Sequence, residues 1–307
     1  MVMVPVKNVV TGRVVNVAMD DRRPRPPVWI KMRKTVGLVF LSIFALFFLA
    51  PLFWIIYVSF VPKIYIFMVP PVIFTDFFGT IKSFNLNSFA LAFGSEWKVG
   101  FSFINSIVIT ASSIILTMIV CSLCAYAFAF MNFPGRDVLF VMILATMMLP
   151  MTTMIAPYYR VLRTYGLLNT RLGLIIPYAA SAFSVFLLRQ YFVRLPMALV
   201  EAAIIDGASR FRVWWQIILP LSKPALITLA IYQFRQIWND FLIPMIVLRD
   251  ERLFTFPLKL QFMSSVTVKF PWDAMMATGC IAILVPFILF LIYQRYFMEG
   301  LSGSIKG

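Results

Sequence analysis

Histidine is absent from this 307-residue chain, which has only three cysteines. A zinc site or a histidine-based catalytic site therefore lacks its usual ligands, and no disulfide framework is implied. Cys121 and Cys124 have CxxC spacing but lie in an apolar run, which favours small residues at a helix–helix contact over a metal or redox site. A glycine-rich loop followed by Lys and Ser or Thr is also missing. We therefore predict no catalytic residue, no metal site and no ATP site of the chain's own.

Charge is scarce as well. Only 13% of the residues are charged and 62% are hydrophobic, whereas a soluble domain has roughly a quarter charged residues. The formal net charge of +15 would suggest nucleic acid in a soluble protein. Here the basic residues lie mostly between long apolar runs, so we expect contact with membrane lipid and not with nucleic acid.

Long apolar runs are what the chain has in abundance. A membrane helix needs about 20 mostly apolar residues, and six runs qualify. The sequence thus predicts an all-α, polytopic membrane protein with six transmembrane helices. The six predicted spans are Val36–Phe60, Phe103–Phe130, Val138–Tyr158, Leu172–Leu188, Leu226–Leu248 and Ala274–Tyr293.

The distribution of Lys and Arg predicts the orientation of these spans. If both termini are cytoplasmic, sixteen basic residues lie inside and ten outside, while Arg235 falls within a span. This bias favours cytoplasmic termini. The chain then divides into a basic N-terminal arm (1–35), a first span with an external loop (36–99), a main membrane domain (100–297) and a cytoplasmic tail (298–307).

A polar and small-residue stretch, Glu201–Pro224, interrupts the apolar runs. Because proline favours a helix start, a short helix is expected to begin near Pro196 and to run from Ala198 to Asp206. Gly207 permits a sharp reversal, and Ser209 can cap a second helix over Arg210–Ile218. Pro220 and Pro224 are expected to end that second helix and to begin the next span. The result is a knob of two helices suited to a groove on another protein, although it could also be an ordinary loop.

This stretch closely resembles the coupling loop of permease subunits in ATP-binding-cassette (ABC) importers, with the carbohydrate-importer pattern EAAxxDGA…IxLPLxxP. Other segments resemble the same group, specifically its maltose-type second permease. They are Phe103–Ser106, Ala125–Gly135, Met148–Pro150, Gly166–Thr170, Trp238–Phe241 and the C-terminal Gly300–Gly307. Together they cover roughly residues 103–307. The residues Met197–Val200, before the glutamate, depart from the more charged family pattern.

The resemblance implies a type I ABC importer permease fold in a prokaryotic inner membrane. It also implies four kinds of partner: a second homologous permease, an ATPase dimer that binds ATP and Mg²⁺, an extracytoplasmic solute-binding protein, and a carbohydrate or polyol substrate. The coupling loop, residues 194–224, would contact the ATPase through Glu201, Ala202, Ala203, Asp206, Gly207, Ala208 and Pro220. The tail would contact it through Ser302, Gly303, Lys306 and Gly307.

Polar residues in the fifth span are candidates for the substrate pathway, because charge in a span usually faces a bundle interior or a wet cavity. They are Tyr232, Gln233, Arg235, Trp238, Asn239 and Asp240. These residues could instead join helices, with Arg235 paired to Asp240. A charged pair of this kind would suit the alternative function, an ion-coupled secondary transporter acting alone. A membrane scaffold without transport is the third possibility.

Overall fold

The computed structural model describes residues 2–7, 14–19, 28–69, 76–266 and 270–302. It consists of two units, residues 1–54 and 55–307. In the first unit, strands β1 (Val2–Lys7) and β2 (Val14–Met19) pair antiparallel, with Val2 opposite Met19. These strands were not foreseen within the predicted N-terminal arm. Alternating valines in both segments are the signal that could have revealed them.

Four helical segments of the described chain are long and apolar enough to span a membrane, and six if two bent helix pairs each count as one span. Helix α1 (Val28–Phe60) contains the first, from Thr35. Helix α6 (Val99–Phe130) is the second; at 1.5 Å per residue its 32 residues are about 48 Å long, more than a hydrocarbon core requires. Helices α9 (Leu172–Ala179) and α10 (Ala182–Phe192) form the third, and α17 (Trp272–Ser302) the fourth.

The predicted span Val138–Tyr158 is wrong as a single helix. Helix α7 (Arg136–Thr146) and helix α8 (Met151–Thr164) meet at 104°. Pro150 caps α8 with an extended backbone (ψ 133°), which a continuing helix cannot adopt. The eleven residues of α7 are about 16 Å long, too short to cross the core alone.

The predicted span Leu226–Leu248 is also interrupted. Helix α14 (Lys223–Trp238) stops before Asp240, and the separate helix α15 (Leu242–Val247) follows. The carboxylate of Asp240 accepts backbone N–H bonds from Leu242 (2.8 Å) and Ile243 (3.4 Å), so it starts the new helix.

The predicted external segments contain several short helices. Three of them, α2 (Lys63–Phe67), α4 (Phe77–Lys82) and α5 (Asn87–Phe93), precede α6. A 3₁₀ turn, η2 (Glu251–Leu253), and helix α16 (Phe256–Ser265) precede α17.

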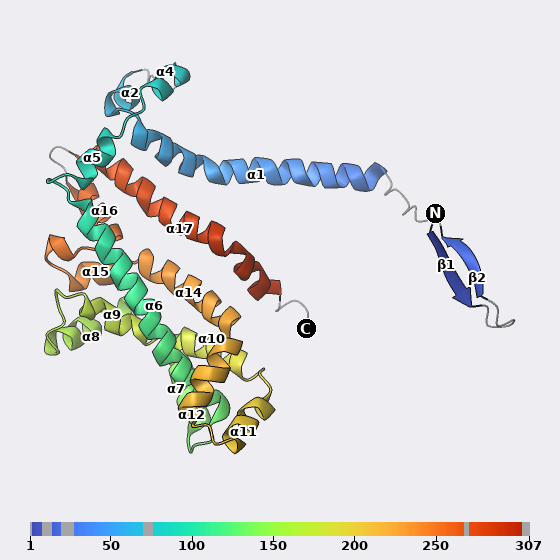
Figure 1. Ribbon diagram of the computed structural model, residues 1–307. Coiled ribbons are helices and arrows are strands. Elements are labelled where there is room, and N and C mark those ends of the chain that lie inside the picture. Colours follow the sequence, from blue (N-terminus) through green and yellow to red (C-terminus); the bar gives the residue numbers. More distant parts are fainter. Residues whose placement is uncertain (1, 8–13, 20–27, 70–75, 267–269, 303–307) are drawn as a thin grey trace. The chain divides into compact units, whose positions relative to one another are not determined.

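Helix α6 is the central element of the second unit (Figure 1), where it packs against α9, α10, α14 and α16. Near its C-terminal end, Cys121, Ala125 and Phe128 belong to one buried apolar cluster that also includes residues of α10, Val200 and Trp214. Near its N-terminal end, Ile109 belongs to a second cluster with Leu162, Leu174 and Val247. One helix therefore connects the two ends of the unit.

Candidate coupling site

Two helices and a glycine turn form the site, as the sequence predicted. Helix α11 (Met197–Ile205) begins directly after Pro196. At its end Gly207 adopts φ +81°, and two backbone bonds close the turn: Gly207 N–H to Ile204 O (3.0 Å) and Ala208 N–H to Ala203 O (2.9 Å). This is the Schellman pattern, in which a residue without Cβ best tolerates the left-handed conformation.

Ser209 caps the second helix, also as predicted, because its Oγ accepts the N–H of Arg212 at 3.3 Å. Helix α12 (Arg210–Val213) then continues through a π-helical turn, η1 (Trp214–Ile218), into α13 (Leu219–Leu221). The second helix ends at Leu221, between Pro220 and Pro224 as expected, but three residues beyond Ile218 and with Pro220 inside α13. The N–H of Leu219 bonds to Trp214 O, five residues back, and this wider turn directly precedes the proline. The break comes at Ser222, where α14 begins after an 80° bend.

One face of the two helices is anchored in the membrane domain. Val200, Val213, Trp214 and Ile218 are buried in the cluster around the C-terminal half of α6. The Nε1–H of Trp214 also donates to Ser122 Oγ of α6 at 3.3 Å. This face of the two helices is therefore held against α6 by buried packing and a hydrogen bond.

The opposite face is open. Ile205 is 85% exposed and Phe211 is 64% exposed, and Ile204 is also exposed. Five further predicted contact residues are exposed: Glu201, Ala202, Asp206, Gly207 and Pro220. Ala203 and Ala208 are half-buried against the apolar cluster on the other face. A Cβ added at Gly207 would meet nothing within 4 Å. Exposed apolar side chains flanked by two carboxylates suit contact with another protein.

Arg189 is a further anchoring residue that the sequence analysis did not identify. Its Nε donates to the carbonyl of Phe128 near the end of α6 (3.3 Å), and its guanidinium lies 4.1 Å from the centre of the Phe140 ring. It thus joins α6, α7 and α10 beside the site. A lone arginine after the apolar run of α10 was the available signal.

The candidate pathway residues differ in how far they are buried. Gln233 and Trp238 are buried and join helices: Gln233 Nε2 donates to Ser184 Oγ (2.9 Å), and Trp238 Nε1 donates to Ala282 O (3.4 Å). Tyr232 is half-buried against Phe183, with ring centres 4.4 Å apart. Arg235 and Asn239 are exposed.

The pairing of Arg235 with Asp240 is wrong. Asp240 Oδ2 accepts the hydroxyl of Tyr178 at 2.6 Å, and its other oxygen caps α15. Arg235 Nη2 instead donates to Gln236 Oε1 at 3.0 Å. The charged pair on which the secondary-transporter alternative depends is therefore not formed.

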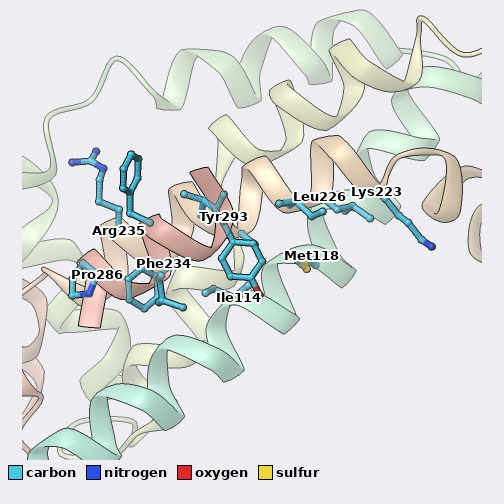
Figure 2. A pocket seen from close by; sticks show the side chains of 13 residues that line it. Ile114, Met118, Lys223, Leu226, Phe234, Arg235, Pro286 and Tyr293 are labelled. Atoms are coloured by element: carbon cyan, nitrogen blue, oxygen red, sulfur yellow. The ribbon is translucent and has the colours of Figure 1, made fainter. Parts of the chain in front are cut away.

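A cavity of about 600 Å³ lies between α6, α14 and α17, and its lining is almost wholly apolar. Of the pathway candidates only Arg235 contributes to it. Figure 2 shows Arg235 and Lys223 at opposite ends of this cavity, with both side chains directed away from its middle. The cavity therefore does not gather the predicted sugar-binding chemistry.

Comparison with known proteins agrees with this architecture. The family model described as "Binding-protein-dependent transport system inner membrane component" matches residues 118–302, which include the whole candidate coupling site. The arabinooligosaccharides transport system permease protein AraQ of Bacillus subtilis is 36% identical over 206 residues, 67% of this chain and 73% of that protein. The sn-glycerol-3-phosphate transport system permease protein UgpE of Rhizobium meliloti is 37% identical over 222 residues, 71% of this chain and 79% of that protein.

The fold also matches a solved structure. A chain of a bacterial ABC transporter involved in the import of the acidic polysaccharide alginate superimposes with a TM-score of 0.77 and 24% identity, over 90% of this chain and 100% of that chain. The all-helical membrane architecture predicted from the sequence is confirmed, with the β1–β2 pair as an addition.

Proposed function

This chain belongs to the family of binding-protein-dependent transport system inner membrane components, and on that premise we propose that the surface around Gly207 couples it to an ATPase dimer during import of a carbohydrate or related polyol. Its relatives are ABC transporter permease subunits and not enzymes. We further propose that ATP and Mg²⁺ bind in the ATPase partner, and that both termini of this chain are cytoplasmic.

The observation that carries the proposal is the contrast between the two faces of the coupling site. Its buried face is bonded to α6, so a force applied to its exposed face would move the membrane helices and not a loose loop. Ile204, Ile205 and Phe211 would enter a groove on the ATPase, and Glu201 and Asp206 would accept hydrogen bonds from basic or N–H groups at its rim.

Motion would pass from the site along α14. Because α13 and α14 are separated only by Ser222, closure of the ATPase dimer would displace the start of α14 directly. Residues 232–240, at the far end of α14 and just beyond it, would shift with it and alternately open the pathway to each side. The tail from Ser302, where α17 ends, would add a second contact to the ATPase; Gly303, Lys306 and Gly307 lie outside the described residues.

The names of the relatives support a proposal for the substrate class. The names of two of them refer to arabinooligosaccharides and sn-glycerol-3-phosphate, both of which are rich in hydroxyl or phosphate oxygens. We propose a cargo of the same chemistry, delivered by an extracytoplasmic solute-binding protein to this chain and a second permease subunit. Tyr232, Arg235, Asn239 and Asp240 remain the candidates for contact with it.

The test is to purify the tagged chain in mild detergent from its native membrane and to identify the proteins that accompany it. We expect a second permease and an ATPase with a phosphate-binding loop. ATP hydrolysis by the reconstituted complex should rise when the solute-binding protein is added with oligosaccharides or polyols. A chain that purifies alone and carries out ion-driven uptake would contradict the proposal.

A further inference from the structure

Asn169 lies in the turn between α8 and α9, near the N-terminal half of α6 and far from the coupling site. Its backbone φ is +58°, a left-handed conformation that asparagine tolerates better than most residues with a side chain. It follows the glycine turn at Gly166 (φ +67°) in the segment that resembles the permease family. The coupling site does not account for it.

The side chain and backbone of Asn169 hold a distant part of the chain. Its Oδ1 accepts the N–H groups of both Arg249 and Asp250, each at 2.9 Å. Its own N–H donates to the carbonyl of Val247 at 2.8 Å. Three hydrogen bonds therefore join this turn to the last residue of α15 and the two residues Arg249 and Asp250 after it, about 80 residues later in the sequence.

Asn105 of α6 makes the matching connection nearby. It is 1% exposed, and its Nδ2 donates to the carbonyls of Arg252 (2.8 Å) and Phe254 (3.2 Å). Its Oδ1 accepts two bonds from the guanidinium of Arg171, at 2.8 and 3.1 Å. Every donor and acceptor of this buried amide is thus used, which fixes its geometry.

Close packing reinforces these bonds. A Cβ at Gly173 would lie 2.2 Å from the carbonyl oxygen of Leu167 and 3.1 Å from Val247 Cγ1. The start of α9 therefore lies directly against both the turn and the end of α15. The N–H of Phe256 also donates to Ser106 Oγ of α6 at 2.7 Å.

We propose that Asn105 and Asn169 are positioning residues for transport, forming a clip that joins the α8–α9 turn, the N-terminal part of α6 and residues 247–256 into one moving body. This inference rests on the proposed function. Helix α6 links the clip to the coupling site: Asn105 and Ser122, which bonds Trp214, are 17 residues apart on it, about 26 Å. With the clip closed, displacement of the coupling site moves both far segments together. With the clip broken, they move separately and ATP hydrolysis proceeds without passage of cargo.

Two substitutions of Asn169 in the reconstituted full transporter distinguish the loss of its side-chain hydrogen bonds from backbone strain at its positive φ. Asn169→Gly tolerates the positive φ but removes the side-chain acceptor. Asn169→Asp keeps an acceptor oxygen and also tolerates this conformation. We expect the Gly variant to assemble and to hydrolyse about tenfold more ATP per molecule of cargo transported, within the range of coupling between distant sites. The Asp variant should keep the wild-type ratio.

The outcomes distinguish failure of the clip proposal from failure of the proposed function. An unchanged ratio in the Gly variant, or a Gly variant that fails to assemble where the Asp variant succeeds, would overturn the proposal; the second result would make the role purely structural. If the wild-type complex shows no ATP hydrolysis stimulated by a binding protein, the proposed function fails instead, independently of the clip.

Hydrogen exchange of the wild-type complex gives a test without any variant. The amides of Arg249 and Asp250 should exchange slowly both without nucleotide and with ATP bound, because a body that moves as one keeps its internal bonds. Fast exchange of these two amides in either state would show that the clip opens, and would overturn the proposal.

Discussion

The glycine turns at Gly166 and Gly207 have the same backbone bonding but different surroundings. At Gly166 the bonds run from Gly166 N–H to Arg163 O and from Leu167 N–H to Leu162 O, the same spacing as at Gly207. After Gly166 the chain packs into a cluster and bonds to residues 247–250. Around Gly207, Ile205 and Phe211 remain exposed. One turn is thus tied by hydrogen bonds to a distant part of the chain, although Tyr165 beside it is exposed, whereas the other keeps an aliphatic and an aromatic side chain exposed for a partner.

The largest difference should come from valine at each glycine. Both positions have positive φ and open space around a new Cβ, so each substitution should cost a similar 1–2 kcal/mol of backbone strain, about what the left-handed conformation imposes. We expect Gly207→Val to abolish transport while the protein still inserts, and Gly166→Val mainly to lower thermal stability. Uptake assays with matched membrane levels measure this. Normal uptake by Gly207→Val, or an equal loss of uptake in both variants, would contradict a partner surface specific to Gly207.

Gly173→Ala should sharpen the contrast by showing how tightly the Gly166 end is packed. The new methyl group would meet a backbone carbonyl, which cannot rotate away. Overpacking of this kind costs about 1–3 kcal/mol of the free energy of unfolding. Thermal unfolding in detergent should show a lower midpoint. Gly37→Ala is the comparison for an added methyl group without a clash, because Gly37 has open space around a new Cβ and no positive φ.

Ile205→Ser should weaken binding of the ATPase with little effect on the chain itself. The side chain is 85% exposed, so its removal costs little folding energy, yet a buried interface residue contributes about 1–2 kcal/mol or more. Roughly tenfold weaker association follows. Tyr165→Ser, which removes a large exposed side chain beside Gly166, is the control and should leave association unchanged. Equal weakening by both would contradict a specific surface at Gly207.

Ser209→Ala should have the smallest effect. It removes the cap of α12 and should cost about 1 kcal/mol, whereas Ser209→Gly should cost only a few tenths. Faster hydrogen exchange at the N–H of Arg212 would report the loss. An unchanged exchange rate would mean that packing of α12 against the buried cluster, and not the Ser209 cap, holds the start of this helix.

The backbone of the candidate coupling site was predictable from the sequence because its signals are local. Pro196, Gly207 and Ser209 each fix the backbone within a few residues, and all three act as expected. The π-helical turn before Pro220 was not predicted, because it depends on a shift in hydrogen bonding that the sequence does not reveal.

The spans and the pathway were less predictable because their breaks occur inside continuous apolar sequence. The turn before Pro150 and the capping role of Asp240 divide runs that hydropathy treats as single helices. The partners of Gln233 and Asn169 lie 49 and about 80 residues away in the chain, so no local pattern could assign them.

The apolar lining of the cavity between α6, α14 and α17 has a consequence for selectivity. Moving a hydroxyl from water into such surroundings without a replacement hydrogen bond costs about 1–3 kcal/mol of transfer free energy. A sugar carries several hydroxyls. Partition into this space would therefore disfavour a saccharide by many orders of magnitude, while hydrocarbon would enter freely. We therefore expect a hydrated cargo to cross along other surfaces, whose polar groups replace the hydrogen bonds of its water.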